Sequence, residues 1–173
     1  MNTVTETITE PRAWIGCLAC YNDGRLVGKW LDTDELEDLD TATICPIFNH
    51  EEFWVMDHEG LPISGECSIS EAYRYGVAVK LVAEQAEYSN IPLVVALQYV
   101  EDSNITNPDN WPDVRDDYRG VAESEQDYVL EYLEESGIEL PSWVQVDWRN
   151  TFEELTEGMS TYRHDGGFYV FGA

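Results

Sequence analysis

Residues 161–171 read TYRHDGGFYVF, and this stretch is typical of a β-hairpin. Two short runs with aromatic and β-branched residues flank Asp165-Gly166. That pair favours a tight two-residue turn because both residues tolerate a positive φ. So short a turn joins antiparallel strands and not parallel ones. The sequence therefore predicts a small antiparallel sheet in the C-terminal part of the chain.

A helix with an unusual charge pattern precedes this hairpin. Residues 124–137 read SEQDYVLEYLEESG, in which Ser124 suits a helix N-cap and Gly137 is typical of a helix end. Acidic residues recur three and four positions apart, where like charges repel and cost about 0.2–0.5 kcal/mol per pair. The lysines that usually relieve this repulsion are absent. The acidic face of the predicted helix consists of Asp127, Glu131, Glu134 and Glu135.

Further helices are predicted in the middle of the chain. Ser68 and Glu71 have the spacing of a capping box. Residues 93–100 fit either a buried helix or a buried strand, and we favour a helix because residues 90–92 resemble a helix start. The apolar face of the first helix consists of Ala72, Gly76, Val79, Ala83 and Ala86. Shorter helical segments are predicted from Asn107-Pro108 to about Tyr118, from Pro141-Ser142, and from Asn150 to Gly158.

The N-terminal part predicts a second small sheet. Residues 13–19 and 26–31 are strand candidates on either side of the polar turn 21–25, which indicates a hairpin with a longer loop. Residues 33–43 are predicted to form a short acidic helix with Thr33 as its N-cap, and residues 52–57 to form a third strand.

These elements predict an α+β fold that is elongated, with small antiparallel sheets near both ends and a helical middle. Four parts are expected along the chain. They are a flexible tail over 1–12, an N-terminal β-sheet with a short helix over 13–62, a central helical domain over 63–105, and a C-terminal α+β domain with the acidic helix and the terminal hairpin over 106–173.

The charge balance restricts the classes of function. Asp and Glu total 35 against 9 Lys and Arg, so the formal net charge is −26. A hydrophobic fraction of 43% supplies a core, which argues against reading the acidity as disorder. Nucleic acids and anionic membranes are excluded as partners because the chain lacks basic clusters. The expected partner is a basic surface. We also expect a cytoplasmic protein, since no secretory signal or membrane-length apolar run is recognisable.

The number of charges is comparable with that of DNA. Duplex DNA carries one charge per ~1.7 Å of axis, so 26 charges correspond to roughly 44 Å of duplex, close to the ~40 Å diameter of a compact domain of this size. We therefore predict that clustered carboxylates imitate DNA phosphates. The candidate surface consists of Asp32, Asp34, Glu35, Glu37, Asp38, Asp40, Asp109, Asp113, Asp116, Asp117, Glu123, Glu125, Asp127, Glu131, Glu134, Glu135 and Glu139.

Two other interpretations of the acidity stay open. Proteins adapted to high salt are also acidic and poor in lysine, so the chain fits a salt-adapted domain of unrelated function. A cation-binding module is the second alternative. The spacing Asp32-x-Asp34 superficially resembles a calcium loop, but Glu37 stands where such a loop requires glycine.

Metal, redox and catalytic sites are not favoured by the remaining residues. Cys17-x-x-Cys20 has the spacing of a zinc or redox pair, but residues three apart on a strand point to opposite faces. Cys45 and Cys67 look isolated in the sequence, so we expect free thiols and no metal. The histidines His50, His58 and His164 are expected on the surface or in loops. Without a phosphate-binding loop or a nucleophile elbow, we expect no enzyme and no cofactor.

An ordered series of short strings resembles the ArdA family of antirestriction proteins. Each string alone is weak, but the ordered set covers most of the chain from Trp14 onward. The strings are YNDGRL (21–26), GKWLD (28–32), DHEG (57–60), YRG (118–120), DYVLEYLEE (127–135), LP (140–141), VDW (146–148) and FYVF (168–171).

The resemblance implies both a shape and a target. ArdA-type proteins are elongated α+β dimers of three small domains, and their acidic surface imitates bent duplex DNA. They occupy the DNA-binding groove of Type I restriction-modification enzymes in the bacterial cytoplasm and protect incoming mobile DNA, without catalysis or cofactor. The family's antirestriction motif falls on about Asp127 to Leu140 here, and the resemblance implies a homodimer whose target is the methyltransferase and specificity core.

Overall fold

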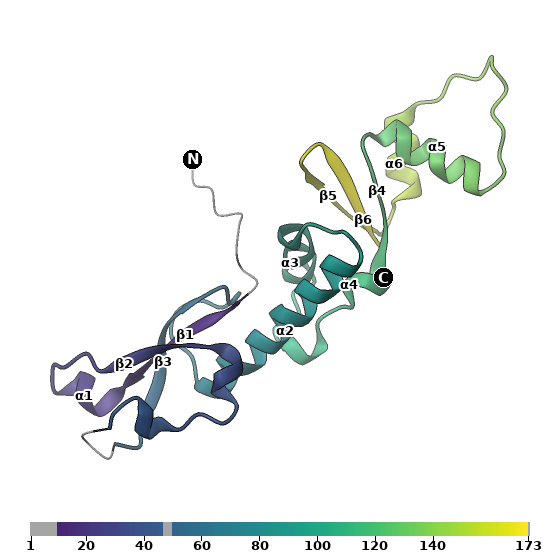
Figure 1. Ribbon diagram of the computed structural model, residues 1–173. Coiled ribbons are helices and arrows are strands. Elements are labelled where there is room, and N and C mark those ends of the chain that lie inside the picture. The colour runs from purple at the N-terminus through teal and green to yellow at the C-terminus, as the bar shows by residue number, and fades with distance from the viewer. Residues whose placement is uncertain (1–9, 47–49, 173) are drawn as a thin grey trace. The chain divides into compact units, whose positions relative to one another are not determined.

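The computed structural model describes residues 10–46 and 50–172, which fall into two compact units (Figure 1). Unit 1 contains the chain up to Glu84 together with Ser103–Trp111, and unit 2 contains Gln85–Asp102 together with the chain from Pro112 onward. Of the predicted flexible tail, residues 1–9 lie outside the described residues. In the described part of that range, Pro11 is buried and Arg12 belongs to a strand.

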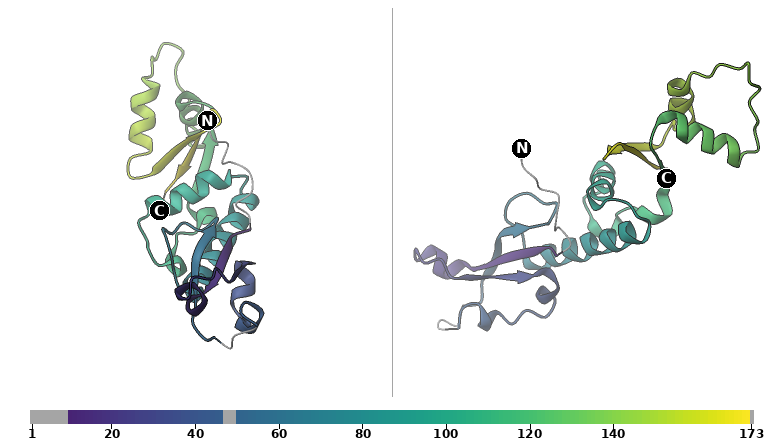
Figure 2. Two further views of the ribbon diagram at one scale, coloured as in Figure 1. Left: turned by 90° about the vertical axis from the view of Figure 1, so that its left-hand side faces the viewer. Right: turned by 45° about the horizontal axis from the view of Figure 1, so that its top comes forward.

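Unit 1 contains the predicted N-terminal sheet, whose strands lie side by side in Figures 1 and 2. All pairings are antiparallel, and β1 lies in the middle in the order β2-β1-β3. Alternate side chains of the central strand, such as Ile15, are fully buried, as expected for a sheet with one face on a core. The strands are β1 (Arg12–Cys17), β2 (Gly28–Asp32) and β3 (Phe53–Glu59).

Two local predictions for unit 1 are wrong in detail. The first strand ends at Cys17, because the next residues turn into the short helix α1 (Leu18–Asn22). The predicted acidic helix over 33–43 is instead two separate 3-10 turns, η1 (Thr33–Leu36) and η2 (Thr41–Thr43). Asp32 and Asp40 accept hydrogen bonds from the first turns of these segments, so acidic side chains cap each turn and the chain does not propagate one helix.

The helix α2 (Ile69–Tyr88) begins as the capping-box spacing predicts. The Glu71 amide donates to the Ser68 hydroxyl at 3.1 Å. The predicted apolar face is buried except at Ala83, which is half-buried. Gly76 lets the helix approach Thr33 so closely that a Cβ at this position would overlap the Thr33 side chain. The register of α2 on unit 1 therefore depends on a glycine inside a helix.

Unit 2 contains the second sheet, in the order β4-β6-β5. The predicted terminal hairpin is confirmed, and φ is +47° at Asp165 and +85° at Gly166, as a two-residue turn with two left-handed residues requires. The strand β4 was not predicted, and the helix expected from Asn107 to Tyr118 is only η3 (Pro108–Asn110) and α4 (Val114–Asp117). The strands are β4 (Tyr118–Ala122), β5 (Ser160–His164) and β6 (Gly167–Phe171).

The remaining helices of unit 2 are α3 (Leu93–Asp102), α5 (Glu125–Glu135) and α6 (Trp148–Leu155). The apolar segment 93–100 is a helix, as we favoured. No helix forms at Pro141, in contrast to the prediction, and α6 starts before Asn150 because Asp147 caps it. A core of Val129, Phe152 and Val170 packs α5 and α6 together with β6.

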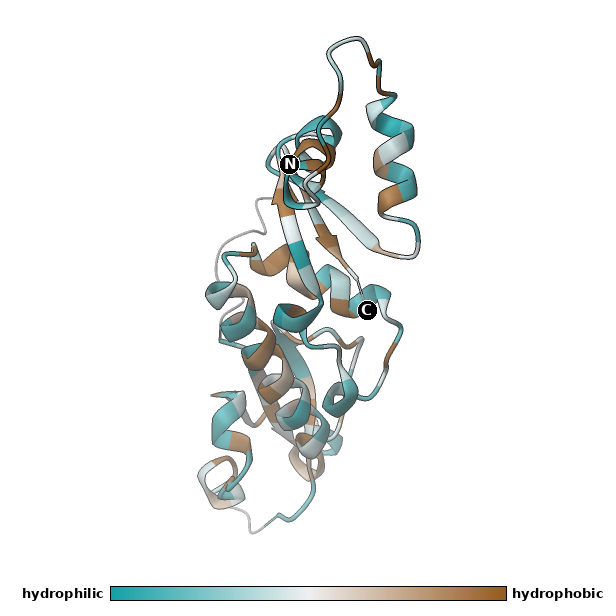
Figure 3. Ribbon diagram, turned by 90° about the vertical axis from the view of Figure 1, so that its right-hand side faces the viewer, coloured by the Kyte–Doolittle hydropathy of each residue, from teal (hydrophilic) through white to brown (hydrophobic). Residues whose placement is uncertain are grey.

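Hydrophobic and hydrophilic residues are interleaved along the ribbon of both units (Figure 3). This interleaving follows from helices and strands that bury only one face each. Among the residues that the structure describes, no helix is both long enough and apolar enough to cross a lipid bilayer.

Candidate functional site

The acidic face of α5 lies opposite the face that packs on the core. With 3.6 residues per turn, the four acidic residues fall within one arc of the helix surface, and Val129 and Leu133 project roughly the other way. The buried side contacts Phe152, which holds the helix in place. The exposed acidic side consists of Asp127, Glu131, Glu134 and Glu135.

The four carboxylates of this face are distinguished by their lack of ion pairs in the described part of the chain. Within residues 10–46 and 50–172, no Lys, Arg or His forms an ion pair with any of them. The negative charge of this face affects the pKa of the neighbouring Tyr128. Burial raises the pKa of Tyr128, Arg119 lowers it, and the charges of Glu131 and Glu135 raise it further. The face is therefore a fixed array of unneutralised charge. The same lack of ion pairs holds for the exposed Glu123 and Glu139 that flank α5.

A second acidic segment, residues 32–40, lies on unit 1. Its six carboxylates are exposed, but Asp32 pairs with Arg12 at 3.3 Å and Asp34 pairs with Lys80. Asp32 and Glu35 also cap η1 reciprocally, and Asp40 caps η2. Glu37 has no ion pair among the described residues, but its hydrogen bond to Tyr73 is the main cause of the raised pKa of that tyrosine. Asp34 and Asp38 add smaller contributions to the same shift.

The other acidic residues of the predicted surface hold the fold together. Asp109 accepts a hydrogen bond from Arg74 at 2.6 Å in unit 1. In unit 2, Asp113 caps α4 and Asp117 accepts a hydrogen bond from Tyr99 at 2.8 Å. Asp116 pairs with Arg115 at 3.2 Å, and Glu125 with Arg163 at 3.7 Å. The structure thus separates the predicted surface into carboxylates with local structural roles and a set without ion pairs, which includes Glu131, Glu134 and Glu135 on α5.

A comparison with protein families matches this chain to a model described as "Antirestriction protein (ArdA)", over residues 13–168. That range runs from β1 into β6 and includes parts of both units. The chain belongs to the ArdA antirestriction family. A search of curated proteins gave no match.

The family match indicates the type of protein and the part of the chain that is shared with the family model. ArdA proteins are antirestriction proteins and are not enzymes, which agrees with the absence of a catalytic motif in the sequence. The matched range also contains the whole of α5 and its acidic face. The acidic helix therefore lies within the part of the chain that matches the family model.

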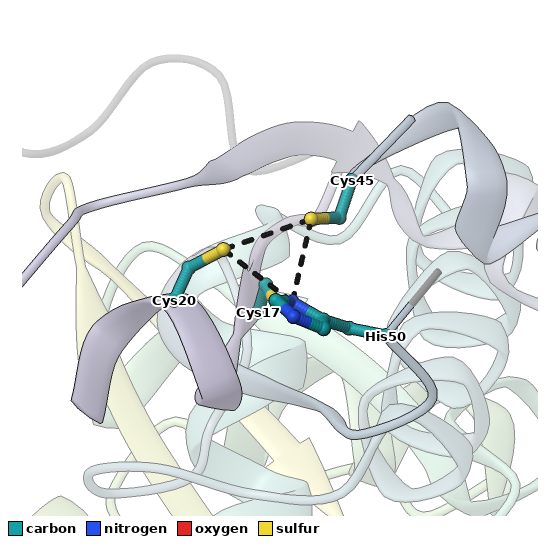
Figure 4. A group of neighbouring side chains, drawn as sticks. All are labelled: Cys17, Cys20, Cys45 and His50. Atoms are coloured by element: carbon teal, nitrogen blue, oxygen red, sulfur yellow. Dashed lines mark hydrogen bonds between the residues drawn. The ribbon is translucent and has the colours of Figure 1, made fainter. Parts of the chain in front are cut away.

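One group of side chains in the ArdA chain was missed by the sequence interpretation. Cys17, Cys20, Cys45 and His50 converge in unit 1, with their potential ligand atoms all within 4.8 Å of one another (Figure 4). The expectation that Cys17 and Cys20 point to opposite faces is wrong, because β1 ends at Cys17 and α1 turns Cys20 back toward it. Cys45 is not isolated either, and His50, which lies in a loop as expected, belongs to the same group. The spacing C-x2-C followed by C-x4-H was the signal that could have found this group.

The three thiols of this cluster are buried and influence one another. The Cys20 and Cys45 sulfurs are 3.6 Å apart, and His50 Nδ1 lies 3.1 Å from the Cys17 sulfur. Burial raises the pKa of Cys20 to about 11, and contacts with the other two sulfurs add to the rise. Burial also raises the pKa of Cys17, but the Cys20 backbone and the His50 side chain outweigh it and bring that pKa to about 7.

Proposed function

We propose that this ArdA protein inhibits a Type I restriction-modification enzyme by occupying the groove that normally holds DNA. Its carboxylates take the positions of DNA phosphates against the basic groove of the methyltransferase and specificity core. The protein acts in the cytoplasm of the host bacterium, where it protects incoming mobile DNA from cleavage.

The acidic face of α5 is the observation that carries this proposal. Its carboxylates are exposed and lack ion pairs in the described part of the chain, and the helix below them is fixed by packing. Neighbouring positions on a helix lie about 5–6 Å apart, which is similar to the spacing of phosphates along a DNA strand. A solvent-exposed helix usually carries lysines that neutralise its carboxylates. Because α5 has no lysine, its carboxylates are available to a basic partner.

Complementary charge explains how such an inhibitor competes with DNA. A field of one sign over a surface steers a partner of opposite sign and raises the association rate. Each exposed ion pair contributes only about 0–1 kcal/mol, so many pairs must act together. We therefore expect single substitutions on α5 to have small effects and combined substitutions to have large ones.

The test is a fourfold charge reversal of the acidic face. The variant Asp127→Lys, Glu131→Lys, Glu134→Lys and Glu135→Lys should inhibit DNA cleavage by a Type I enzyme about 100-fold less well than the unchanged protein, as expected when several charge pairs are lost together. The measurement is cleavage of unmodified DNA at rising inhibitor concentration, with circular dichroism to verify the fold.

A matched control keeps the net charge of the fourfold variant but leaves α5 intact. It reverses four exposed acidic residues elsewhere in unit 2: Glu101, Glu153, Glu154 and Glu157. This control should inhibit nearly as well as the unchanged protein. If both variants lose inhibition equally, overall charge and not the α5 face is responsible; if neither does, the placement of the site is wrong.

We further propose that the protein acts as a homodimer. Exposed apolar side chains lie within α5 and in the segment after it, where Trp143 is 80% exposed. Exposed large apolar side chains that gather in a patch are typical of contacts between proteins. A second copy of the chain is the occupant we propose, and light scattering after gel filtration measures the mass directly. The other members of this apolar set are Leu130, Tyr132, Ile138 and Leu140.

A further inference from the structure

We propose that Cys17, Cys20, Cys45 and His50 form a structural zinc site in unit 1. The four ligands come from three separate places in the chain. Cys17 ends β1, Cys20 lies in α1, and Cys45 and His50 lie between η2 and β3. Figure 4 shows the four side chains pointing into one common space.

The distances between the ligand atoms fit a tetrahedral metal. With Zn–S of about 2.3 Å and Zn–N of about 2.0–2.1 Å, tetrahedral zinc separates its ligand atoms by about 3.8 Å for two sulfurs and about 3.6 Å for sulfur and nitrogen. The Cys20 and Cys45 sulfurs lie 3.6 Å apart. His50 Nδ1 lies 3.5 Å from the Cys20 sulfur and 3.7 Å from the Cys45 sulfur. Cys17 and His50, at 3.1 Å, lie about half an ångström closer than the tetrahedral separation, and all four ligand atoms lie within 4.8 Å of one another.

The donor set selects zinc among the common biological metals. Thiolates are soft ligands that suit zinc, and three thiolates with one imidazole are a usual set for closed structural sites. Carboxylates, which calcium and magnesium prefer, are absent from this group of four. Four protein ligands leave no open position for water or substrate. The site is therefore structural and has no catalytic role.

Burial explains why a metal stabilises this arrangement. The three cysteines are nearly inaccessible to solvent and belong to the core of unit 1. On binding, each thiol releases its proton to solvent and the resulting thiolate donates to the metal. Three thiolates alone would place three negative charges in the core, whereas zinc reduces the net charge of the site to minus one. This matters more in a chain that already carries a large negative charge.

The proposed site also has a position that suits a structural role. It joins the end of β1 to the segment that follows η2, and so holds one end of the acidic segment 32–40. Unit 1 otherwise has a small core with a three-stranded sheet. Small units of this kind often depend on metals or disulfides for stability.

The first test is the metal content of the full chain. The protein is produced in zinc-supplemented medium, purified without chelators under reducing conditions, and analysed by inductively coupled plasma mass spectrometry. We expect one zinc ion per chain. In the variants Cys20→Ser and Cys45→Ser the zinc content should fall about tenfold or more, because each removes one of four ligands.

The fourth cysteine provides the matched control. Cys67 is buried in the same core, at a bridge to Val55, but lies outside the cluster of ligands. The variant Cys67→Ser should keep one zinc ion per chain, although it disturbs the core by the same chemical change. Equal loss of zinc in Cys67→Ser and Cys20→Ser would contradict the assignment of the ligands.

A second measurement on the unchanged protein covers the case in which the serine variants do not fold. Cobalt replaces zinc in tetrahedral thiolate sites and then shows strong visible absorption together with charge transfer from sulfur. We expect this spectrum when cobalt is added to the metal-free chain, and its loss when one equivalent of zinc follows. Removal of zinc by a chelator should also lower the melting temperature.

Three outcomes would overturn the proposal. They are a protein without zinc after purification from supplemented medium, a cobalt complex without the tetrahedral thiolate spectrum, and a disulfide between Cys20 and Cys45 in the reduced preparation. The restriction assay is not involved in any of these measurements. The zinc site can therefore fail while the proposed antirestriction function stands, and the reverse also holds.

Discussion

Two buried tyrosines of unit 2 each donate a hydrogen bond to a carboxylate. The Tyr99 hydroxyl donates to Asp117 at 2.8 Å, and the Tyr162 hydroxyl donates to Asp102 at 3.0 Å. Burial is the main cause that raises the pKa of both phenols, and the hydrogen bond to the carboxylate is the second. The pKa of Tyr162 rises to about 12. Some acidic residues of this chain therefore serve its own core and not a partner.

The raised phenol pKa predicts how stability depends on pH. The folded state favours the neutral phenol, so the contribution of Tyr162 is fully present below the ordinary pKa of 10 and is lost as pH rises toward about 12. The variant Tyr162→Phe should lower the free energy of unfolding by about 1 kcal/mol below pH 10, and this difference should shrink above it. Denaturant unfolding across this pH range measures both effects.

A conservative change in the other unit is the control for this prediction. Tyr21→Phe, at a position 59% exposed in unit 1, should leave the pH dependence of unfolding unchanged. A difference between Tyr162→Phe and the unchanged protein that stays constant across the whole range would contradict the role given to the buried phenol.

At the scale of the element, the acidic helix depends on its N-terminal cap. The Ser124 hydroxyl accepts a hydrogen bond from the Asp127 amide at 3.1 Å, and Glu125 and Asp127 lie in the first turn, where negative charge is favourable. Further along, the carboxylates only repel one another. The cap and the packing of Val129 therefore compensate the repulsion on the exposed face.

The cap gives a prediction for α5. Ser124→Ala should lower the free energy of unfolding by about 1 kcal/mol, because one amide at the start of the helix loses its acceptor. Ser136→Ala at the other end should cost less, since the Ser136 side chain makes no hydrogen bond within the described residues. Thermal unfolding of the two variants side by side measures the difference. Equal losses of unfolding free energy in the two variants would mean that the Ser124 cap does not stabilise α5 specifically.

Other elements show why the local sequence pattern did not always predict the correct secondary structure. The stretch 33–43 has a helical charge pattern, yet Asp32 and Asp40 each cap a separate short turn. The strand β4 lacks clear alternation, and it forms because β6 supplies an antiparallel partner. By contrast, α2 carries its own start signal, and α5 and the terminal hairpin carry both start and stop signals, and these were predicted correctly.

At the scale of the whole molecule, salt separates the proposed function from salt adaptation. Screening shortens the range of charge interactions from about 10 Å at 0.1 M salt to about 3 Å at 1 M. A DNA mimic should therefore inhibit restriction less well as salt rises, and should stay folded when salt is removed. The measurements are inhibition across a salt series and near-ultraviolet circular dichroism in dilute buffer. Unfolding in dilute buffer would favour the salt-adapted interpretation.

The sequence by itself determined the features that depend on neighbouring residues or on composition. The sequence predicted the helix caps and the Asp165-Gly166 turn because these depend on the conformation of neighbouring residues. It predicted the α+β class from the order of these local elements, and the excess of negative charge from the composition. The ordered strings also pointed to the ArdA family, which the family comparison shows. The elongated outline stays a prediction, which small-angle X-ray scattering would test.

Only the tertiary structure decided which polar side chains are engaged and which are free. It showed that Asp109 and Asp117 are partnered, whereas Glu131, Glu134 and Glu135 of α5 have no ion pair among the described residues. It also brought Cys17 and Cys20 together with Cys45 and His50, 25 and more residues further along the chain. The physical reason is that ion pairs and metal ligands depend on distance in space, which the chain sets only when β1, α1 and β3 pack on one core.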